Sequence, residues 1–402
     1  MNIKQYLVIT GNYWGFTLTD GALRMLVVLY FHQLGYSPLA IAMLFLFYEF
    51  FGVVTNLVGG YLGARIGLNR TMHIGLGLQI VALAALTVPE HMLTVAWVMI
   101  AQALSGIAKD LNKMSAKSAI KLLVPDNAQN TLYKWVAALT GSKNALKGVG
   151  FFLGGLLLTL VGFQGALWIM IVGLVLINLT SYFLLQSELG VAKVKPKFKE
   201  ILSKSGPINV LSAARMFLFG ARDVWFVVAL PVFLSQQFNW DHWQVGGFLA
   251  SWVIFYGVVQ ALAPKITGGR KDAATLNDGP GRQAALLWSA LLTLLPVAIA
   301  FGLMLNMAAE YVIVIGLLLF AVVFAVNSSL HSYLIIRYAS ADGVSLDVGF
   351  YYMANAMGRL IGTVLSGLVY QYAGLVACLW FSAGFLLITF VLTHWLPKES
   401  EA

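Results

Sequence analysis

Four lysines follow one another at intervals of four residues in the stretch SGIAKDLNKMSAKSAIKLL: Lys109, Lys113, Lys117 and Lys121. The stretch continues directly from the apolar run LTVAWVMIAQAL. A lysine deep in a membrane helix costs about 2.5 to 3.5 kcal/mol on insertion scales, so it needs a role that offsets this cost. At about 100° per residue, the four lysines form a slowly winding stripe about 18 Å long. We expect Lys117 and Lys121 to reach the lipid headgroups as flanking charges. The deeper Lys109 and Lys113 either do the same or line the path of an anion.

A second group of cations opens the next apolar segment, which begins with Lys143, Asn144 and Lys147. Ionisable groups inside membrane spans usually face a water-filled cavity and mark a substrate path. We predict that Lys147 binds ligand, because the equivalent position in the second half of the chain is the cationic Arg359, which has Asn355 one turn before it. The alternative for Arg359 is a structural contact with a helix end.

The first apolar segment contains Asp20 and Arg24, which lie one turn apart on one helix face. They either neutralise each other or present Arg24 to a central cavity. The seventh segment carries Arg215, Arg222 and Asp223, and its two arginines share a face. A guanidinium donates paired hydrogen bonds to carboxylate or phosphate oxygens, whereas lysine supplies a point charge. We therefore expect Arg24, Arg215 and Arg222 to bind an oxyanion.

Two further polar positions lie within apolar segments. Glu49 is either a proton carrier or the ion-pair partner of a cation such as Arg24. In AVNSSLHSYLIIR, Asn327 and His331 either donate hydrogen bonds to a ligand or belong to a satisfied cluster between helices. We assign coupling or gating to the remaining charges near these positions, which are Asp20, Glu49, Asp110, Asp223, Arg65 and Arg70. Since cations outnumber carboxylates in these segments, the pattern favours an anionic ligand over a cationic drug.

The elements that position these residues are membrane spans. The chain has 402 residues, of which 60% are hydrophobic and 10% charged, and this composition is typical of a membrane protein. The N-terminal MNIKQY runs into an apolar segment without a small-residue cleavage site, so we expect no cleaved signal peptide. The single Cys378 excludes a disulfide within the chain and a thiolate metal cluster.

Apolar runs long enough to cross about 30 Å of hydrocarbon recur twelve times. They lie near residues 6–31, 39–62, 72–88, 93–115, 145–164, 166–186, 208–234, 244–263, 284–305, 311–336, 349–371 and 375–396. Alternate connections, such as HQLGYSP, VPEHML and SQQFNWDHW, contain no lysine or arginine, whereas the other set contains the basic run VAKVKPKFKEILSKSGP. The positive-inside rule therefore predicts that the basic connections and both termini are cytoplasmic.

The basic run halfway along the chain predicts a linker at 188–207 between six-span halves at 1–187 and 208–402. A parallel internal repeat supports this division. A shift of 212 residues pairs Lys147 with Arg359, and it also pairs three glycines of one half with glycines of the other: Gly150 with Gly362, Gly155 with Gly367 and Gly162 with Gly374. A shift of 203 residues pairs Asp20 with Asp223. We therefore predict an all-α membrane protein of two pseudo-symmetric six-helix bundles.

The connection GGYLGARIGLNR, between the second and third spans, resembles the signature of the major facilitator superfamily. Arg65, Gly67 and Arg70 stand where that signature has them, but Ala64 occupies the place of its usual aspartate. The resemblance implies a transporter of the major facilitator fold, working by rocking of two bundles about a central site. The arrangement of cations in spans one and seven is similar to that of the superfamily's organophosphate antiporters.

A longer resemblance is carried by GNYWGFTLTDGALRMLVVLYFHQLGYSP, FLFYEFFGVVTNLVGG and ALSGIAKDLNKMSAKSAIKLLVP. These stretches resemble the ArsJ-type organoarsenical efflux permeases. The resemblance implies export of 1-arseno-3-phosphoglycerate across the inner (cytoplasmic) membrane and resistance to arsenate. It also implies a metabolic partnership, without physical contact, with a glyceraldehyde-3-phosphate dehydrogenase that makes this ester.

Several motifs are missing from the sequence. It contains no GxxxxGK[ST] loop, HExxH, CxxC or GxSxG. We therefore expect no enzyme activity, no metal or cofactor and no nucleic-acid partner, and we expect a monomer in the lipid bilayer that is driven by a gradient. Two alternatives stay open: an antiporter of phosphate esters or other organic anions, and a membrane receptor that transports nothing.

Overall fold

A computed structural model of the chain describes residues 3–36, 44–125, 128–185, 189–192, 204–240, 242–267 and 279–397. Within these ranges the secondary structure is helical and contains no strand. The helices of the first half are α1 (Ile3–Gln33), α3 (Leu46–Ile66), α4 (Leu68–Ala85), the 3-10 turn η1 (Glu90–Met92), α5 (Val95–Leu123) and α6 (Gln129–Leu184). Those of the second half are α7 (Gly206–Phe226), α8 (Ala229–Phe238), α9 (His242–Ile266), α10 (Arg282–Met304), α11 (Ala309–Tyr338) and α12 (Val344–Thr393).

Two of these helices each contain two predicted spans. α6 is interrupted at Gly162 (φ 71°, ψ −179°), and α12 is interrupted at Gly374 (φ 73°, ψ −173°). Glycine alone adopts this backbone conformation readily, because a Cβ would clash with the backbone. The two glycines are mates in the predicted repeat and have the same conformation. With α7 and α8 forming one broken span, the described helices account for all twelve predicted passes.

Six helical stretches in the described residues are long and apolar enough to cross a membrane by themselves: 129–184, 206–238, 244–266, 282–304, 309–338 and 344–393. The helices outside this set are α1, α3, α4 and α5. α1 and α5 carry half of the charged candidate residues of the first half, and these charges lower the mean hydropathy of the two helices.

Several helix ends differ from the predicted span ends. α5 continues to Leu123, beyond the predicted end at 115, and α6 begins at Gln129 rather than near 145. Hydropathy detects only the apolar part of a helix, so it misses these polar extensions. The seventh span is broken after Phe226, and the hydroxyl of Ser366 accepts hydrogen bonds from the backbone N–H groups of Val228 and Ala229, at 3.2 and 3.1 Å.

The chain divides into two compact units. Unit 1 comprises Met1–Asp126, Ser142–Ser203 and Ala339–Met353; unit 2 comprises Asn127–Gly141, Lys204–Tyr338 and Ala354–Ala402. The start of α6 therefore belongs to unit 2, and the start of α12 belongs to unit 1. Most of the predicted linker at 188–207 lies outside the described residues, so its limits stay a prediction.

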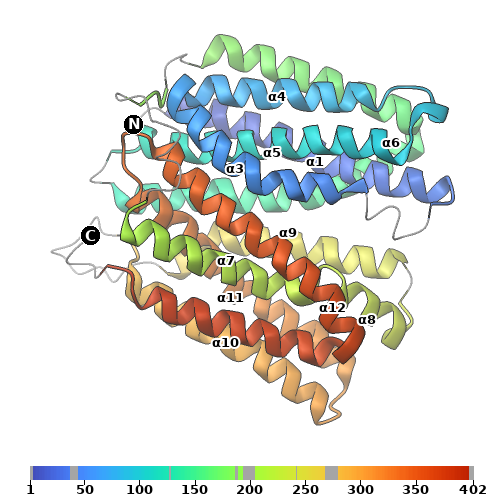
Figure 1. Cartoon of the computed structure of the whole chain (residues 1–402), viewed down its shortest axis with the longest axis vertical. Helices are drawn as coiled ribbons and strands as arrows, with labels where there is room; N and C mark the ends of the chain where they lie inside the picture. The colour runs from blue at the N-terminus through green and yellow to red at the C-terminus, as the bar shows by residue number, and fades with distance from the viewer. Residues whose placement is uncertain are drawn as a thin grey trace. The chain divides into compact units, whose positions relative to one another are not determined.

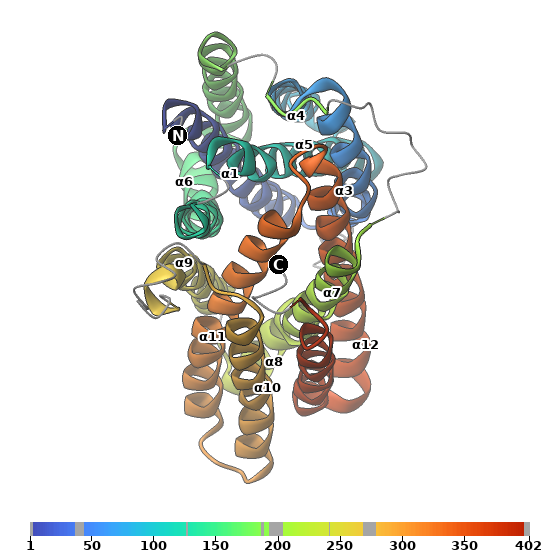
Figure 2. The same cartoon turned by 90° about the vertical axis from the view of Figure 1, so that its left-hand side faces the viewer.

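In unit 1, α5 packs against α1, α3 and α4 (Figures 1 and 2). The core of this unit contains Phe16, Leu26, Leu76 and Leu167, each at most 1% exposed. The start of α12 packs closely on α3, because a Cβ on Gly349 would lie 2.6 Å from the carbonyl oxygen of Asn56. Small residues at such crossings let the backbones of membrane helices approach closely.

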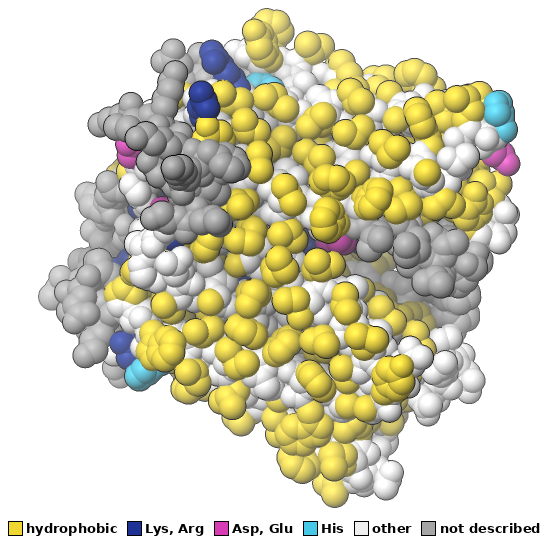
Figure 3. Space-filling view, in the orientation of Figure 1, with side chains coloured by type: hydrophobic (Ala, Val, Ile, Leu, Met, Phe, Trp, Pro, Cys, Tyr) yellow, Lys and Arg dark blue, Asp and Glu magenta, His cyan; other side chains and the backbone are white. Residues whose placement is uncertain are grey.

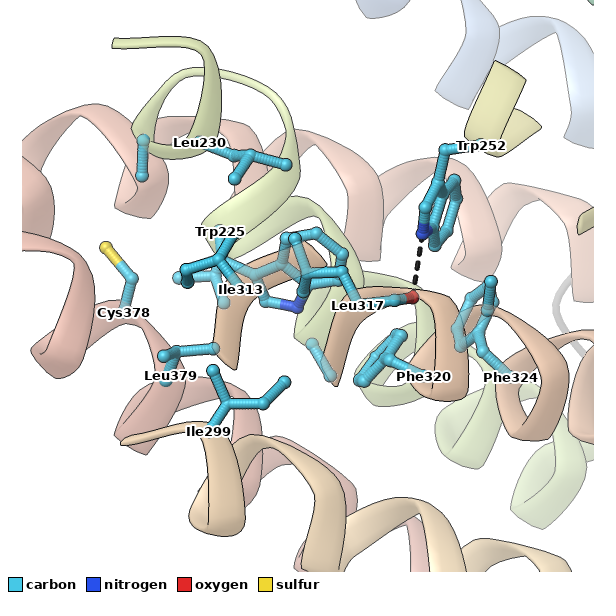
Figure 4. Packing of buried hydrophobic residues seen from close by; sticks show 14 of the residues in the cluster. Trp225, Leu230, Trp252, Ile299, Ile313, Leu317, Phe320, Phe324, Cys378 and Leu379 are labelled. Atoms are coloured by element: carbon cyan, nitrogen blue, oxygen red, sulfur yellow. Dashed lines mark hydrogen bonds between the residues drawn. The ribbon is translucent and has the colours of Figure 1, made fainter. Parts of the chain in front are cut away.

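In unit 2, α10 lies alongside α11 (Figure 2), and α11 also packs against α7 and α9. Aromatic rings fill the core: Trp225 lies edge-on to Phe320, with ring centroids 5.0 Å apart. The indole N–H of Trp252 donates to the backbone carbonyl of Leu317 at 2.8 Å (Figure 4). The buried polar end of an aromatic side chain usually finds such a partner in an apolar interior.

Hydrophobic side chains cover most of the visible surface (Figure 3). Examples from both units are Leu160, Phe183, Leu294 and Tyr311, which are 69, 80, 63 and 70% exposed. Exposed apolar surface of this extent is expected where lipid, rather than water, surrounds a protein.

Candidate functional site

The first cluster of candidate residues joins α1, α3 and α6 in unit 1. Asp20 is 5% exposed, accepts a hydrogen bond from the hydroxyl of Tyr48 at 2.6 Å and lies 4.0 Å from the ammonium of Lys147. A glycine crossing makes this approach possible: a Cβ on Gly21 would lie 2.7 Å from the carbonyl oxygen of Lys147 and 3.2 Å from Cα of Gly150.

Arg24 lies one turn further along α1 and contacts α3. Its Nη2 donates to Oε1 of Glu49 at 3.1 Å. Its guanidinium carbon lies 4.7 Å from the ring centroid of Tyr48 and 5.1 Å from that of Phe45. The interpretation of Glu49 as an ion-pair partner of Arg24 is confirmed. Both side chains keep some exposure, 27% for Arg24 and 32% for Glu49, so a ligand can reach this pair.

Three lysines of the α5 stripe, Lys109, Lys113 and Lys117, point into unit 1. The ammonium of Lys109 lies 3.8 Å from the ring centroid of Tyr48 and 4.0 Å from the carboxylate of Asp110. The ammonium of Lys113 donates to the same carboxylate at 2.5 Å. An ammonium over a tyrosine face is attracted by the ring's negative charge density, so Tyr48 helps to hold Lys109 in place.

Lys117, one turn further along α5, is also buried in the protein. It is only 4% exposed, and its ammonium donates to the hydroxyl of Tyr352 at 2.5 Å. The expectation that Lys117 reaches the lipid headgroups is therefore wrong, because α5 stays buried beyond the apolar segment and the start of α12 covers it. The ammonium of Lys113 also lies near this tyrosine, 4.8 Å from the ring centroid.

Unit 2 contains a similar ion cluster. The carboxylate of Asp223, 0% exposed, accepts from Nε of Arg222 at 2.6 Å and from Nε of Arg359 at 3.2 Å. The crossing of α7 and α12 is again made by glycines, since a Cβ on Gly362 would lie 2.7 Å from the carbonyl oxygen of Gly220.

Arg215 lies two turns before Arg222 on α7. It is 2% exposed, and it donates from Nε to the side-chain oxygen of Asn355 at 2.9 Å and from Nη1 to the carbonyl of Ser328 at 3.1 Å. The ring of Phe219 lies between the two arginines, 4.0 Å from the guanidinium carbon of Arg215 and 5.0 Å from that of Arg222. The two arginines share one helix face, as the sequence predicts.

The two polar candidates on α11 differ from each other. The amide of Asn327 donates to the carbonyls of Trp288 and Val323, at 2.7 and 3.1 Å. The bond to Trp288 joins α11 to α10, whereas Val323 is on α11 itself; the first bond favours the interpretation as an interhelical polar contact. His331 is fully buried, and neither ring nitrogen has a hydrogen-bond partner among the described residues.

The remaining candidates lie at the margins of unit 1. Lys143 donates to the side-chain oxygen of Asn144 at 3.3 Å. Arg65 donates to the hydroxyl of Tyr61 at 2.5 Å, and Arg70 is exposed. Both arginines flank Gly67, which connects α3 to α4 with a φ of 99°.

The charges of these clusters define what they can bind. In unit 1 six cations (Arg24, Lys109, Lys113, Lys117, Lys143 and Lys147) accompany three carboxylates (Asp20, Glu49 and Asp110). In unit 2 three arginines accompany Asp223. The described residues contain no group of three His, Cys, Asp or Glu side chains that could hold a metal ion. Cations therefore outnumber carboxylates in the described cluster of each unit.

Sequence reasoning missed the tyrosines. Tyr48 and Tyr352, which are not among the predicted site residues, contact four of the interior cations, namely Arg24, Lys109, Lys113 and Lys117. The position of Tyr48 next to Glu49 is the one signal that could have identified it. Tyr352 gives no such signal, because it is 235 residues from Lys117.

Long apolar helices, an apolar exterior and interior charges are typical of a multi-pass membrane protein. The profile of the Major Facilitator Superfamily matches residues 7–276, and the chain belongs to this superfamily. None of the curated proteins compared with the sequence matches it.

Solved structures with the same fold carry various cargoes. The human organic anion transporter MFSD10 (TETRAN) is 18% identical, with a TM-score of 0.73 over 98% of this chain and 99% of that chain. A bacterial homologue of the iron transporter ferroportin, in an outward-facing state, is 15% identical, with a TM-score of 0.73 over 96% and 98%. The proton:xylose symporter XylE, bound to 6-bromo-6-deoxy-D-glucose, is 13% identical, with a TM-score of 0.75 over 99% and 97%. At these identities the likeness concerns the fold alone.

Proposed function

We propose that this chain is a secondary active exporter of an organic arsenate ester, 1-arseno-3-phosphoglycerate. The observation that carries the proposal is the surplus of interior cations over carboxylates in each unit. Lys117 and Arg215 are buried, and the other cations are partly exposed. A multiply charged ester that leaves water for a protein interior needs several charged partners to offset its desolvation. Six cations around α5 in unit 1 and three arginines in unit 2 supply such partners.

The contacts of these cations explain how they stay in the interior without substrate. The carboxylates of Asp20, Asp110 and Asp223 each contact cations, and the faces of Tyr48 and Phe219 hold others. In this proposal an incoming oxyanion replaces part of these contacts. The charged hydrogen bonds it gains are of the same kind as those it breaks.

The arsenate ester is supported by the long resemblance to ArsJ-type permeases, not by the geometry. The cell inner membrane, the cytoplasmic termini and the dehydrogenase that supplies the ester belong to the same proposal. Substrate binding is assigned to Lys109, Lys113, Lys147 and the arginines of α1, α7 and α12. Coupling is assigned to the carboxylates that contact them, and gating to Arg65 and Arg70.

Exchange of an ordinary phosphate ester is the second candidate function. One observation favours it: the ammonium and guanidinium groups of both units recognise phosphate and arsenate oxygens by the same hydrogen bonds. Everted membrane vesicles that contain the full chain separate the two, if uptake of the arsenate ester and of 3-phosphoglycerate is measured side by side.

The vesicle experiment also tests the site. We expect Arg24→Ala, Lys147→Ala and Arg222→Ala to abolish uptake of the arsenate ester and arsenate resistance, while the membrane abundance of each variant is retained. Lys134→Ala, an exposed lysine on the same helix as Lys147, is the matched control and should keep full activity. Full resistance in all three variants contradicts the proposed site, and absence of flux in the wild type favours a receptor.

A further inference from the structure

Two tyrosines divide the cations of unit 1 into two groups. Around Tyr48 lie the guanidinium of Arg24 and the ammonium of Lys109, at 4.7 and 3.8 Å from the ring centroid, and the Tyr48 hydroxyl donates to Asp20. Around Tyr352 lie the ammonium groups of Lys113 and Lys117. We call these groups the Tyr48 centre and the Tyr352 centre.

The two centres have a fixed spacing, because their lysines belong to one helix. Lys109 and Lys113 are one turn apart on α5, a rise of about 6 Å, and Lys117 lies about 6 Å further along. Asp110 joins the centres, since its two carboxylate oxygens lie 4.0 Å from Lys109 and 2.5 Å from Lys113. At the Tyr352 centre, Asp110 is the one carboxylate that the described contacts place beside Lys113 and Lys117, so this centre keeps a positive charge. At the Tyr48 centre, Asp20 and Glu49 balance Arg24 and Lys109, and the ammonium of Lys147, 4.0 Å from Asp20, adds a further positive charge.

The charged side chains of the two centres differ in their exposure. The side chains of Lys109 and Lys113 are 13 and 14% exposed, whereas that of Asp110 is 2% exposed and Lys117 is 4% exposed. A ligand can therefore approach the first two ammonium groups, with Lys117 behind Tyr352. The phenol oxygen of Tyr352 accepts from Lys117 and also carries an O–H that can donate. The Tyr48 hydroxyl donates a hydrogen bond of this kind to the carboxylate of Asp20.

We propose that Tyr352, with Lys113 and Lys117, forms a second anion subsite, and that the substrate carries two anionic groups about one helical turn apart. One group binds at the Tyr48 centre and the other at the Tyr352 centre. Lys113 and the Tyr352 hydroxyl contact the second group, and Lys117 is a positioning residue that acts through Tyr352. The inference rests on the proposed function and assigns the two anionic ends of its substrate to two different centres.

The test compares two probes that share a phosphate and differ in the second group. 3-Phosphoglycerate has a carboxylate at the other end, whereas glycerol 3-phosphate has an uncharged hydroxyl. Transport of both is measured in proteoliposomes containing the purified full chain. We expect the wild type to prefer 3-phosphoglycerate by at least about tenfold in kcat/KM, because a built site rejects an analogue that leaves its polar groups unpaired.

Tyr352→Phe and Lys117→Met should reduce this preference to about twofold or less. They should do so by raising KM for 3-phosphoglycerate, with KM for glycerol 3-phosphate unchanged within about twofold. Lys117→Arg keeps a donor for the phenol oxygen and should retain the preference. Tyr351→Phe loses a hydroxyl from the neighbouring tyrosine, whose ring centroid lies 4.9 Å from that of Tyr352, and should behave as the wild type.

Equal losses for both probes, or an unchanged preference in Tyr352→Phe and Lys117→Met, would overturn the subsite while leaving the proposed function in place. A wild type that neither transports nor binds either probe by calorimetry would also overturn the subsite. The proposed function fails separately, if everted vesicles that contain the full chain take up no arsenate ester. If Tyr352→Phe does not purify as a monodisperse protein, Lys117→Met and Lys117→Arg decide the question by themselves, because both act on the same phenol oxygen.

Discussion

The ammonium of Lys147 lies 4.0 Å from the carboxylate of Asp20, where α1 and α6 cross at glycines. Unit 2 repeats this relationship, with Arg359 on α12 donating to Asp223 on α7 at 3.2 Å. These four residues are the repeat pairs predicted from the shifts of 203 and 212 residues. Each half of the chain therefore holds a carboxylate on its first span and a cation on its fifth.

Removal of the carboxylate in such a pair should cost stability. Asp223 is 0% exposed and contacts two arginines, so Asp223→Ala leaves two guanidinium groups without this acceptor. Breaking a buried pair by removing one partner costs about 3–5 kcal/mol. We expect a clear drop in the unfolding temperature of the purified protein in detergent. Glu310→Ala, at an exposed glutamate of α11, should change the unfolding free energy by about 0.5 kcal/mol or less. If both variants lower the unfolding free energy equally, the ion pairs of Asp223 contribute nothing measurable to stability.

The second prediction concerns the glycines at which α7 and α12 cross in unit 2. A Cβ on Gly362 would lie 2.7 Å from the carbonyl oxygen of Gly220 and 2.9 Å from Cβ of Asp223, so Gly362→Ala should push α12 away from α7. Overpacking of this kind costs about 1–3 kcal/mol. Gly367 lies on the same helix, and a Cβ added there would meet no heavy atom within 4 Å, so Gly367→Ala should be neutral or stabilising. Thermal unfolding of both variants in detergent checks the difference, and equal unfolding temperatures would contradict it.

The turn inside α6 depends on backbone conformation rather than on space. Gly162 has a φ of 71° and a ψ of −179°, yet a Cβ added there would meet no heavy atom within 4 Å. Gly162→Ala should therefore cost about 1–3 kcal/mol through strain alone. Gly173, also on α6 and also with open space around its Cβ position, has a helical backbone, so Gly173→Ala is the control. If the two variants unfold at the same temperature, the turn tolerates a side chain.

The spans, the repeat and the glycine turns could be predicted from the sequence, because each depends on local composition or on self-similarity at a fixed shift. Gly162 and Gly374, paired by the shift of 212 residues, have the same backbone conformation in the structure. The polar helix extensions could not be predicted from hydropathy. The stretch from Gln129 to Asn144 is helical but lies outside the apolar run.

The partners of the charged residues were harder to predict than the charges themselves. Arg24 could pair within its own helix or with another helix, and only the three-dimensional structure shows its side-chain contact with Glu49 on α3. Lys117 occupies a position at which a flanking charge is normal, but the start of α12 places Tyr352 on it. Such contacts join residues that are distant in sequence, so no local pattern contains them.

The orientation of the chain in the membrane can be tested by cysteine labelling. The single Cys378 is fully buried, so Cys378→Ala provides a background for single substitutions. The positive-inside rule places the α10–α11 connection, which lacks lysine and arginine, outside the cytoplasm. Met307→Cys, 57% exposed there, should react with an impermeant maleimide in intact cells, whereas Lys4→Cys should react only after permeabilisation. The opposite labelling would reverse the predicted orientation.

The ion pair between Arg24 and Glu49 allows a test of the two roles proposed for the carboxylate. Both side chains are about a third exposed, so the pair contributes about 1 kcal/mol or less. If Glu49 only competes with the anion for Arg24, Glu49→Gln should lower KM for 3-phosphoglycerate by up to about fivefold, without altering the response of transport to a proton gradient. If Glu49 carries a proton, the same variant should lose that response. Glu90→Gln removes a charge at an exposed position, where Tyr30 donates to the carboxylate at 3.2 Å, and should leave both properties unchanged. A higher KM with an intact response to the gradient would instead mean that Glu49 holds Arg24 in its binding position.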